Sequence, residues 1–176
     1  MSPYAKAPRE TCVELGGIYC CFCVILILEV YMNKFSTDLL AALNGATKAR
    51  SLAKAVKKIR LAADQGDASA QYNLGLMYLN GDGVPQDKAA ALKWFRLAAD
   101  QRNARAQFNL GVMYDNGEGA PEDKTEALKW YRLAADQGHA KAQFNLGVMY
   151  KKGEGAPKNK KESAKWYRLA AKQGIN

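Results

Sequence analysis

The sequence predicts an all-α fold, a right-handed α-solenoid of about three and a half stacked helix-turn-helix units with a period of 36 residues. Three repeated features support this prediction. The string AAD recurs at residues 62–64, 98–100 and 134–136, and AAK follows at 170–172. NLGLMY at residues 73–78 returns as NLGVMY at 109–114 and 145–150. One tryptophan and one proline keep the same spacing, at Trp94, Trp130, Trp166, Pro85, Pro121 and Pro157.

The first helix of each unit is expected to follow a polar capping residue: Asp67, Asn103 and His139. Ala70, Leu74 and Tyr78 then form one apolar helical stripe in the first unit, and a glycine follows each helix. A further glycine stands inside each helix, at residues 75, 111 and 147. Such a glycine costs about 1 kcal/mol relative to alanine. Because it recurs at one position, we expect a neighbouring helix to pack closely against it.

The second helix of each unit follows a G-x-G-x-P loop, in which glycine favours the helix end and proline prevents continuation. It is expected to begin after Asp87, Asp123 and Asn159, and to run to Gln101, Gln137 and Gln173. Trp94, Leu97 and Ala98 are predicted to share its buried face. A helix pair of this size cannot bury its own apolar stripe, so we expect neighbouring units to cover it.

Five segments organise the predicted chain. Residues 1–35 form an N-terminal apolar segment, and residues 36–66 form N-terminal capping helices or a half repeat. Three full units are predicted at residues 67–102, 103–138 and 139–174. The half repeat retains RLAADQG, but Lys58 and Ile59 replace the Trp-aromatic pair of the full units. We therefore interpret it as a polar-faced cap on the array.

These units resemble the Sel1-like repeat family, which is related to tetratricopeptide repeats. The similarity rests on A-x-A-Q-[YF]-N-L-G-x-M-Y, the paired loop glycines and A-L-K-W-[YF]-R-L-A-A, and covers residues 67–174. It implies an α-solenoid that scaffolds or adapts proteins, without a reaction. One departure is Arg102, which stands where Gly66 and Gly138 close other helices, so that turn is expected to be strained or reshaped.

The first residues of the chain have a different character. Residues 18–28, IYCCFCVILIL, are an uninterrupted apolar run, and the four cysteines are Cys12, Cys20, Cys21 and Cys23. Three interpretations remain open: an export signal or weak anchor, an early-assigned start with Met32 as the true one, and a packed helix or acylated anchor. A signal or anchor would make the protein exported, periplasmic or membrane-associated, with membrane contact through residues 1–31 only. Otherwise a cytoplasmic location is expected.

Composition narrows the functional classes. Apolar residues make up 48 % of the chain, and its net charge is +9 with a pI near 9.4. Both ends of the repeat array are basic around a mildly acidic centre, without the continuous basic face of a nucleic-acid-binding protein, so no nucleic-acid partner is predicted. The chain has one histidine, and the paired glycines of each inter-helix loop enclose a single carboxylate, at Asp82, Glu118 and Glu154. We therefore predict no catalytic residue, metal or cofactor.

Candidate binding residues come from the resemblance, which implies that the first helices line the concave face. Polar positions that vary between units are candidates for partner binding or, alternatively, a solvated face: Ser69, Arg105, Lys141, Leu79, Asp115, Lys151, Asn80, Asn116 and Lys152. Three asparagines repeat unchanged and either bond a peptide backbone or tie neighbouring helices: Asn73, Asn109 and Asn145. We expect the second, structural role for them.

The function predicted from the sequence is a non-enzymatic adaptor, scaffold or regulator that binds a peptide segment or a partner helix on the concave face. Arg105, Lys141 and Lys151 favour an acidic protein partner. One alternative is an exported interaction factor that acts on envelope or host proteins. Another is a hydrolase, by analogy with cysteine-rich relatives, although no cysteine lies between residues 24 and 176. No oligomeric state is predicted.

Overall fold

The computed structural model describes residues 45–48 and 50–175. The chain divides into two units, Met1–Arg50 and Ser51–Asn176, and the repeat array lies wholly within the second. The apolar run at residues 18–28, its cysteines and Met32 lie outside the described residues. Among the described residues, no helix has the length and apolar character needed to span a membrane.

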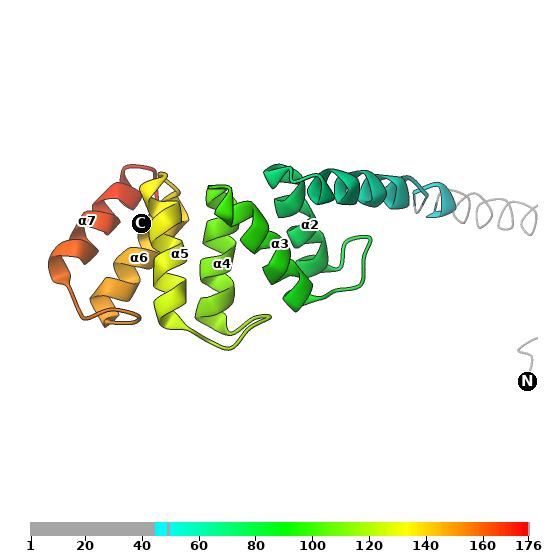
Figure 1. Cartoon of the computed structure of the whole chain (residues 1–176). Coiled ribbons are helices and arrows are strands. Elements are labelled where there is room, and N and C mark those ends of the chain that lie inside the picture. The colour runs from blue at the N-terminus through cyan, green and yellow to red at the C-terminus, as the bar shows by residue number, and fades with distance from the viewer. Residues whose placement is uncertain (1–44, 49, 176) are drawn as a thin grey trace, which may run out of the picture. The chain divides into compact units, whose positions relative to one another are not determined.

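The second unit is built from stacked antiparallel helix pairs (Figure 1). Residues 51–64 are helical, and the pairs that follow are α2 (Ala68–Asn80) with α3 (Lys88–Asp100), α4 (Ala104–Asn116) with α5 (Lys124–Asp136), and α6 (Ala140–Lys152) with α7 (Lys160–Ala171). The second helix of each pair also packs on the first helix of the next, α3 on α4 and α5 on α6. The described residues contain no strand, and the predicted all-α helix-turn-helix solenoid is confirmed.

The helix ends lie where the capping residues predict them. The Asp67 carboxylate accepts a hydrogen bond from the backbone N–H of Ala70 at 2.6 Å, and His139 Nδ1 accepts one from Ala142 at 3.3 Å. The first helices end at glycines with positive φ, 81° at Gly81, 69° at Gly117 and 82° at Gly153. The second helices end slightly earlier than predicted: α3 and α5 stop one residue before Gln101 and Gln137, and α7 stops at Ala171, two residues before Gln173.

The interior glycines of the first helices accommodate aromatic rings from the second helices. A Cβ atom at Gly75 would lie 2.7 Å from the Phe95 ring, and one at Gly111 would lie 2.5 Å from the Tyr131 ring. Such distances are far shorter than a normal carbon–carbon contact, so no larger side chain fits without movement of the ring. The predicted close packing at these glycines is confirmed, and the packing partner is the second helix of the same unit.

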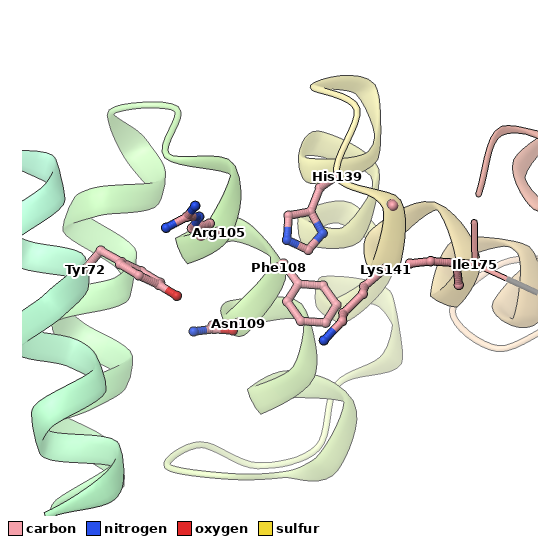
Figure 2. A pocket seen from close by; sticks show the side chains of 8 residues that line it. Tyr72, Arg105, Phe108, Asn109, His139, Lys141 and Ile175 are labelled. Carbon is pink, nitrogen blue, oxygen red and sulfur yellow. The ribbon is translucent and has the colours of Figure 1, made fainter. Parts of the chain in front are cut away.

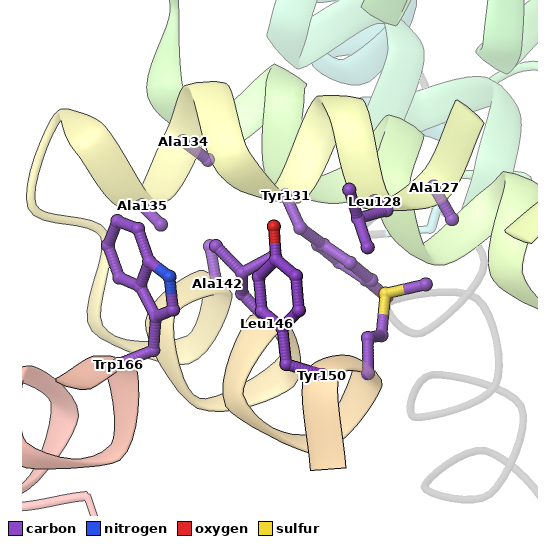
Figure 3. Packing of buried hydrophobic residues seen from close by; sticks show 10 residues of the cluster. Ala127, Leu128, Tyr131, Ala134, Ala135, Ala142, Leu146, Tyr150 and Trp166 are labelled. Carbon is purple, nitrogen blue, oxygen red and sulfur yellow. The ribbon is translucent and has the colours of Figure 1, made fainter. Parts of the chain in front are cut away.

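The core combines small alanines with these rings. Figure 3 shows Tyr131 between Leu146 and Ala127, and Trp166 of α7 belongs to the same buried cluster. The prediction that Leu97 is buried is wrong, because its side chain is 48 % exposed. Two residues correspond to a rotation of about 200° around a helix, so Leu97 lies opposite the buried Phe95. Its counterparts Leu61 and Leu133 are exposed too, by 60 % and 47 %.

A ladder of glutamines connects successive units. Gln107 is 3 % exposed, and its Nε2 donates to the carbonyl of Ala99 on the preceding helix at 3.0 Å. Its Oε1 accepts a hydrogen bond of 2.6 Å from Gln137. Gln71 and Gln143 repeat both contacts, to the equivalent alanines and glutamines. These buried amides are therefore satisfied, and they fix the register between neighbouring helix pairs.

The turn between the first two full units is strained rather than reshaped. Arg102 has a φ of 65°, close to the 92° of Gly66 and the 85° of Gly138 at the equivalent turns. A residue with a Cβ atom pays a steric cost in this left-handed region. The backbone of the turn is thus conserved between units, and the substitution of glycine by arginine leaves strain in it.

Candidate partner-binding groove

Two adjoining hollows lie along the N-terminal halves of the first helices. One, of about 400 Å³, is lined by Ser69, Tyr72, Asn73, Asn103, Ala104 and Arg105. The other, of about 420 Å³, is drawn in Figure 2 and is lined by Tyr72, Arg105, Phe108, Asn109, His139, Ala140, Lys141 and Ile175. Because both include Tyr72 and Arg105, the hollows join into one surface, called the first-helix groove from here on.

Three of the nine sequence candidates line this groove. Ser69, Arg105 and Lys141 occupy the first turns of α2, α4 and α6, and all three side chains are exposed. Their common place in successive first helices follows from the repeat. The structure therefore brings one hydroxyl and two cationic groups to a single surface.

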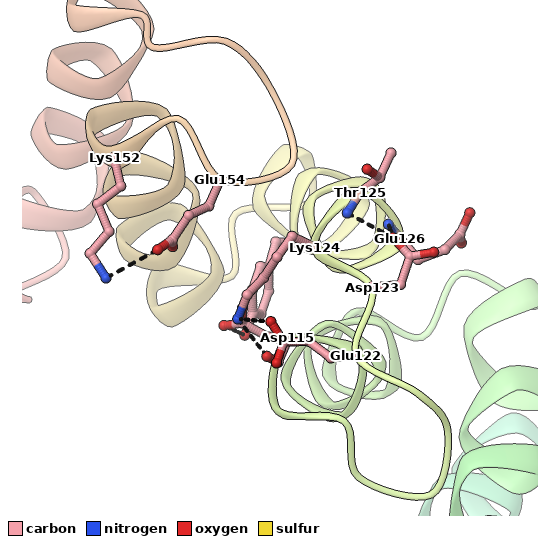
Figure 4. A network of polar contacts seen from close by, with 9 residues as sticks. Asp115, Glu122, Asp123, Lys124, Thr125, Glu126, Lys152 and Glu154 are labelled. Atoms are coloured by element: carbon pink, nitrogen blue, oxygen red, sulfur yellow. Dashed lines mark hydrogen bonds and ion pairs between the residues drawn. The ribbon is translucent and has the colours of Figure 1, made fainter.

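The other six candidates lie in the last turns of the first helices and line neither hollow: Leu79, Asn80, Asp115, Asn116, Lys151 and Lys152. Several of them have local partners. Leu79 packs against the apolar core, and Asn80 donates to the Asp82 carboxylate at 3.1 Å. Lys152 pairs with Glu154 at 3.6 Å, as drawn in Figure 4.

Asp115 belongs to a polar cluster that stabilises the second full unit. Lys124 Nζ lies 2.9 Å from its carboxylate and donates to its backbone carbonyl at 2.6 Å (Figure 4). The hydrogen bond to Asp115 raises the pKa of Lys124 above its usual value. The Tyr131 hydroxyl donates to the same carboxylate at 3.3 Å, and burial raises the pKa of Tyr131, so it remains a donor. These contacts indicate a structural role for Asp115.

The charge in the groove comes from Arg105 and Lys141. In the part of the chain that the structure describes, neither cation forms an ion pair, whereas Lys124, Lys129 and Lys152 do. His139 stacks on Phe108 with 4.6 Å between ring centroids. Burial, and then the charges of Lys141 and Arg105, lower the pKa of His139 below 6.5. The imidazole therefore resists protonation, and the groove presents two unpaired cations beside aromatic surface.

The aromatic residues of the groove were not among the sequence candidates. Tyr72 and Phe108 occupy the same position of α2 and α4, and each lies against a ring of the following helix, with centroids 5.8 Å apart for Tyr72–Phe95 and 5.9 Å for Phe108–Tyr131. Both are partly exposed where they line the hollows. The signal available in the sequence was the aromatic residue that follows A-x-A-Q in each full unit.

The three repeated asparagines have different surroundings. Asn145 interacts with Tyr131 and lowers the pKa of its hydroxyl, against the larger opposite effect of burial. Asn73 and Asn109 line the groove instead. The structural role expected for the three asparagines stays a prediction. The described residues hold no cluster of three or more His, Cys, Asp or Glu side chains able to bind a metal.

Comparison with protein families gives three consecutive matches to the Sel1 repeat, over residues 68–103, 104–139 and 140–175. The chain belongs to the Sel1 repeat family. Each Sel1 repeat comprises one helix pair of the structure, α2 with α3, α4 with α5 and α6 with α7. Proteins built from Sel1 repeats are generally non-enzymatic scaffolds for protein–protein interaction. A search of curated proteins found no match.

Solved structures of Sel1 repeat proteins resemble the chain. One is c5321, a protective antigen of uropathogenic Escherichia coli, at 46 % identity and a TM-score of 0.69 over 70 % of this chain and 26 % of that one. Another, from Oxalobacter formigenes, has 41 % identity and a TM-score of 0.65 over 70 % and 92 %. The cysteine rich protein B of Helicobacter pylori, at 21 % identity and a TM-score of 0.56 over 73 % and 92 %, shares the fold. This chain spans about a quarter of the E. coli protein's length.

Proposed function

We propose that this Sel1 repeat protein is a non-enzymatic adaptor whose first-helix groove binds an extended, acidic segment of a partner protein. The observation that carries the proposal is the presence in one groove of Arg105 and Lys141, neither of which pairs with a carboxylate of the described residues, beside Tyr72 and Phe108. Unpaired cations in a hollow favour carboxylates, because an acidic ligand completes their electrostatic environment.

The groove suits a peptide in both charge and shape. An Arg105 guanidinium can bind a carboxylate through two parallel N–H groups, and Lys141 adds a second positive charge one repeat further along. Apolar side chains of the peptide would lie against Tyr72, which lines both hollows, and Phe108, which lines the larger one. The groove runs across successive first helices, so a bound segment would contact more than one repeat.

A random-peptide display selection on the full chain tests this proposal. We expect the selected peptides to be enriched in aspartate and glutamate. The strongest peptide, labelled with fluorescein, is then measured by fluorescence anisotropy against R105E/K141E and against K151E/K152E. The second variant reverses the same total charge in the last turn of α6, outside both hollows.

The groove variant R105E/K141E should lose at least about tenfold in affinity, and K151E/K152E should lose much less. A selection that enriches no acidic peptide would contradict the proposal. Equal losses in the two variants would also contradict it, because they would reflect net charge rather than the groove.

A further inference from the structure

One position of the repeat changes its chemistry along the first-helix groove. It is the residue that precedes each first helix, together with its equivalent after α7: Asp67, Asn103, His139 and Ile175. The backbone N–H of each donates to the carbonyl of the alanine five residues earlier, at distances between 3.0 and 3.2 Å. The four side chains therefore hold equivalent places, while their character changes from carboxylate to amide, imidazole and aliphatic group.

The two hollows of the groove differ in the same direction. The smaller hollow is lined by the amides of Asn73 and Asn103. The larger hollow instead contains the side chains of Phe108, His139 and Ile175. One end of the groove is therefore mainly polar, and the other adds ring and aliphatic surface to its charged groups.

The rings of Phe108 and His139 form a fixed wall of the larger hollow. They stack with centroids 4.6 Å apart and an interplanar angle of 21°. Each ring is also held from a second side, since Phe108 lies 5.9 Å from the Tyr131 centroid and His139 Nδ1 accepts the N–H of Ala142 at 3.3 Å. Figure 2 shows the two rings together, in the same hollow as Arg105. Rings held in this way offer a preformed surface, which lowers the entropic cost of binding.

The equivalent place in the first full unit combines different residues. Tyr72 holds the position of Phe108, and Asn103 holds the position of His139. An amide offers hydrogen bonds rather than a ring face, so a ligand side chain placed there would meet one ring instead of two. The stacked ring pair is therefore a feature of the groove between α4 and α6.

The surroundings of this ring pair restrict the side chain that it can bind. Burial, and then the charges of Lys141 and Arg105, lower the pKa of His139, so the imidazole is neutral above pH 6.5. The same two cations line the hollow and would repel a lysine or arginine of the ligand. An aromatic side chain fits this place, because rings that pack against each other gain more than their buried area alone provides.

We propose that the larger hollow binds an aromatic side chain of the ligand against the stacked rings of Phe108 and His139. This inference rests on the proposed function and names the ligand class more closely, as an acidic segment that carries an aromatic residue beside its carboxylates. His139 determines this specificity, because it supplies a ring where the preceding unit has an amide. The aromatic residue lies at the α6 end of the groove, so the segment binds in one orientation.

Anisotropy with the display-selected peptide tests this pocket in the full chain. We expect the peptide to contain phenylalanine, tyrosine or tryptophan besides its acidic residues, and replacement of that residue by alanine should weaken binding by about fivefold. His139→Asn keeps a capping side chain like that of Asn103 but removes the ring. With this variant the same change in the peptide should alter the affinity by less than about twofold. Asp67→Asn exchanges a cap outside both hollows and is the matched control, in which the full effect should remain.

The possible outcomes separate this inference from the proposed function. If the selected peptides are acidic without enrichment in aromatic residues, the groove binds acidic segments but the aromatic pocket is wrong. If the change from aromatic residue to alanine weakens binding equally in the wild type and in His139→Asn, the aromatic side chain binds elsewhere, and the inference is also wrong. If R105E/K141E itself binds normally, the proposed function fails, and the inference fails with it.

Discussion

Replacing Gly111 with alanine should destabilise the array, although alanine is the better helix former. A Cβ atom at this position would lie 2.5 Å from Tyr131 Cδ1 and 2.6 Å from Cε1. Carbon atoms prefer a separation of about 3.5–4.0 Å, so the ring has to move by about 1 Å. The ring has little room, because it is 1 % exposed, lies against Phe108 and is held through its hydroxyl by Asp115.

The magnitude follows from two opposing contributions. Removing a glycine from a helix interior gains about 1 kcal/mol. Overpacking a buried site costs about 1–3 kcal/mol, and the displaced hydroxyl loses hydrogen bonds of about 1 kcal/mol each. Because the buried ring has little room to move, we expect the overpacking cost to lie in the upper part of this range and the free energy of unfolding to fall by about 1–2 kcal/mol overall. For an array of this size that corresponds to a fall in melting temperature of about 4–8 °C.

Gly147→Ala is the matched control. Its Cβ atom would lie 3.0 Å from the Tyr167 ring, which is only partly buried on the last described helix. A movement of a few tenths of an ångström suffices there, so the gain in helix propensity should offset the cost to within about 0.5 kcal/mol. Thermal unfolding of both variants, followed by circular dichroism, measures the difference. If Gly111→Ala melts at or above the wild type, the ring does not pack on that glycine as described.

Four further substitutions test individual features. Arg102→Gly should remove the strain of the left-handed backbone and raise the free energy of unfolding by about 0.5 kcal/mol. Gly138→Ala introduces that strain at an equivalent turn with open space around it, and should lower the free energy of unfolding by about 1 kcal/mol. Thermal unfolding measures both, and effects of the same sign would contradict strain at this turn. Folding lowers the pKa of His139, so the neutral side chain contributes its full stability to the fold at pH values above 6.5. This contribution is lost as the pH falls from 6.5 toward the pKa of the folded state, because the unfolded chain takes up the proton first. His139→Asn, which keeps a capping side chain like that of Asn103, should remove this part of the pH dependence in melting profiles; an unchanged profile would contradict the assignment. Gln107→Leu should lower the free energy of unfolding in urea by about 1–3 kcal/mol, because it leaves the Ala99 carbonyl and the Gln137 amide without their hydrogen-bond partner. An unchanged free energy of unfolding would show that the glutamine ladder does not stabilise the array.

Much of the fold is predictable from the sequence because the repeat makes each local signal appear several times. The capping residues and the interior glycines are examples, since a costly residue that recurs at one position implies a packing reason. Leu97 shows the opposite case. Its spacing from Trp94 and Ala98 is helical, yet the buried face is centred on Phe95, and only the neighbouring helices define that centre.

The candidate site is predictable in part. The helical period places Ser69, Arg105 and Lys141 together, because they occupy one position of successive helices. Residues ten positions further, such as Leu79, lie about 15 Å along the axis and about 80° around it, so they reach a different surface.

The most direct test of the groove is to map the bound peptide by NMR. The display-selected peptide is added to isotope-labelled full-length protein, and backbone amide shifts are followed through the titration. We expect the largest changes at Arg105, Asn109 and Lys141, within the two hollows. Changes confined to the second helices, around the exposed Leu97 and Leu133, with the groove signals unmoved, would show that binding occurs elsewhere and would contradict the account.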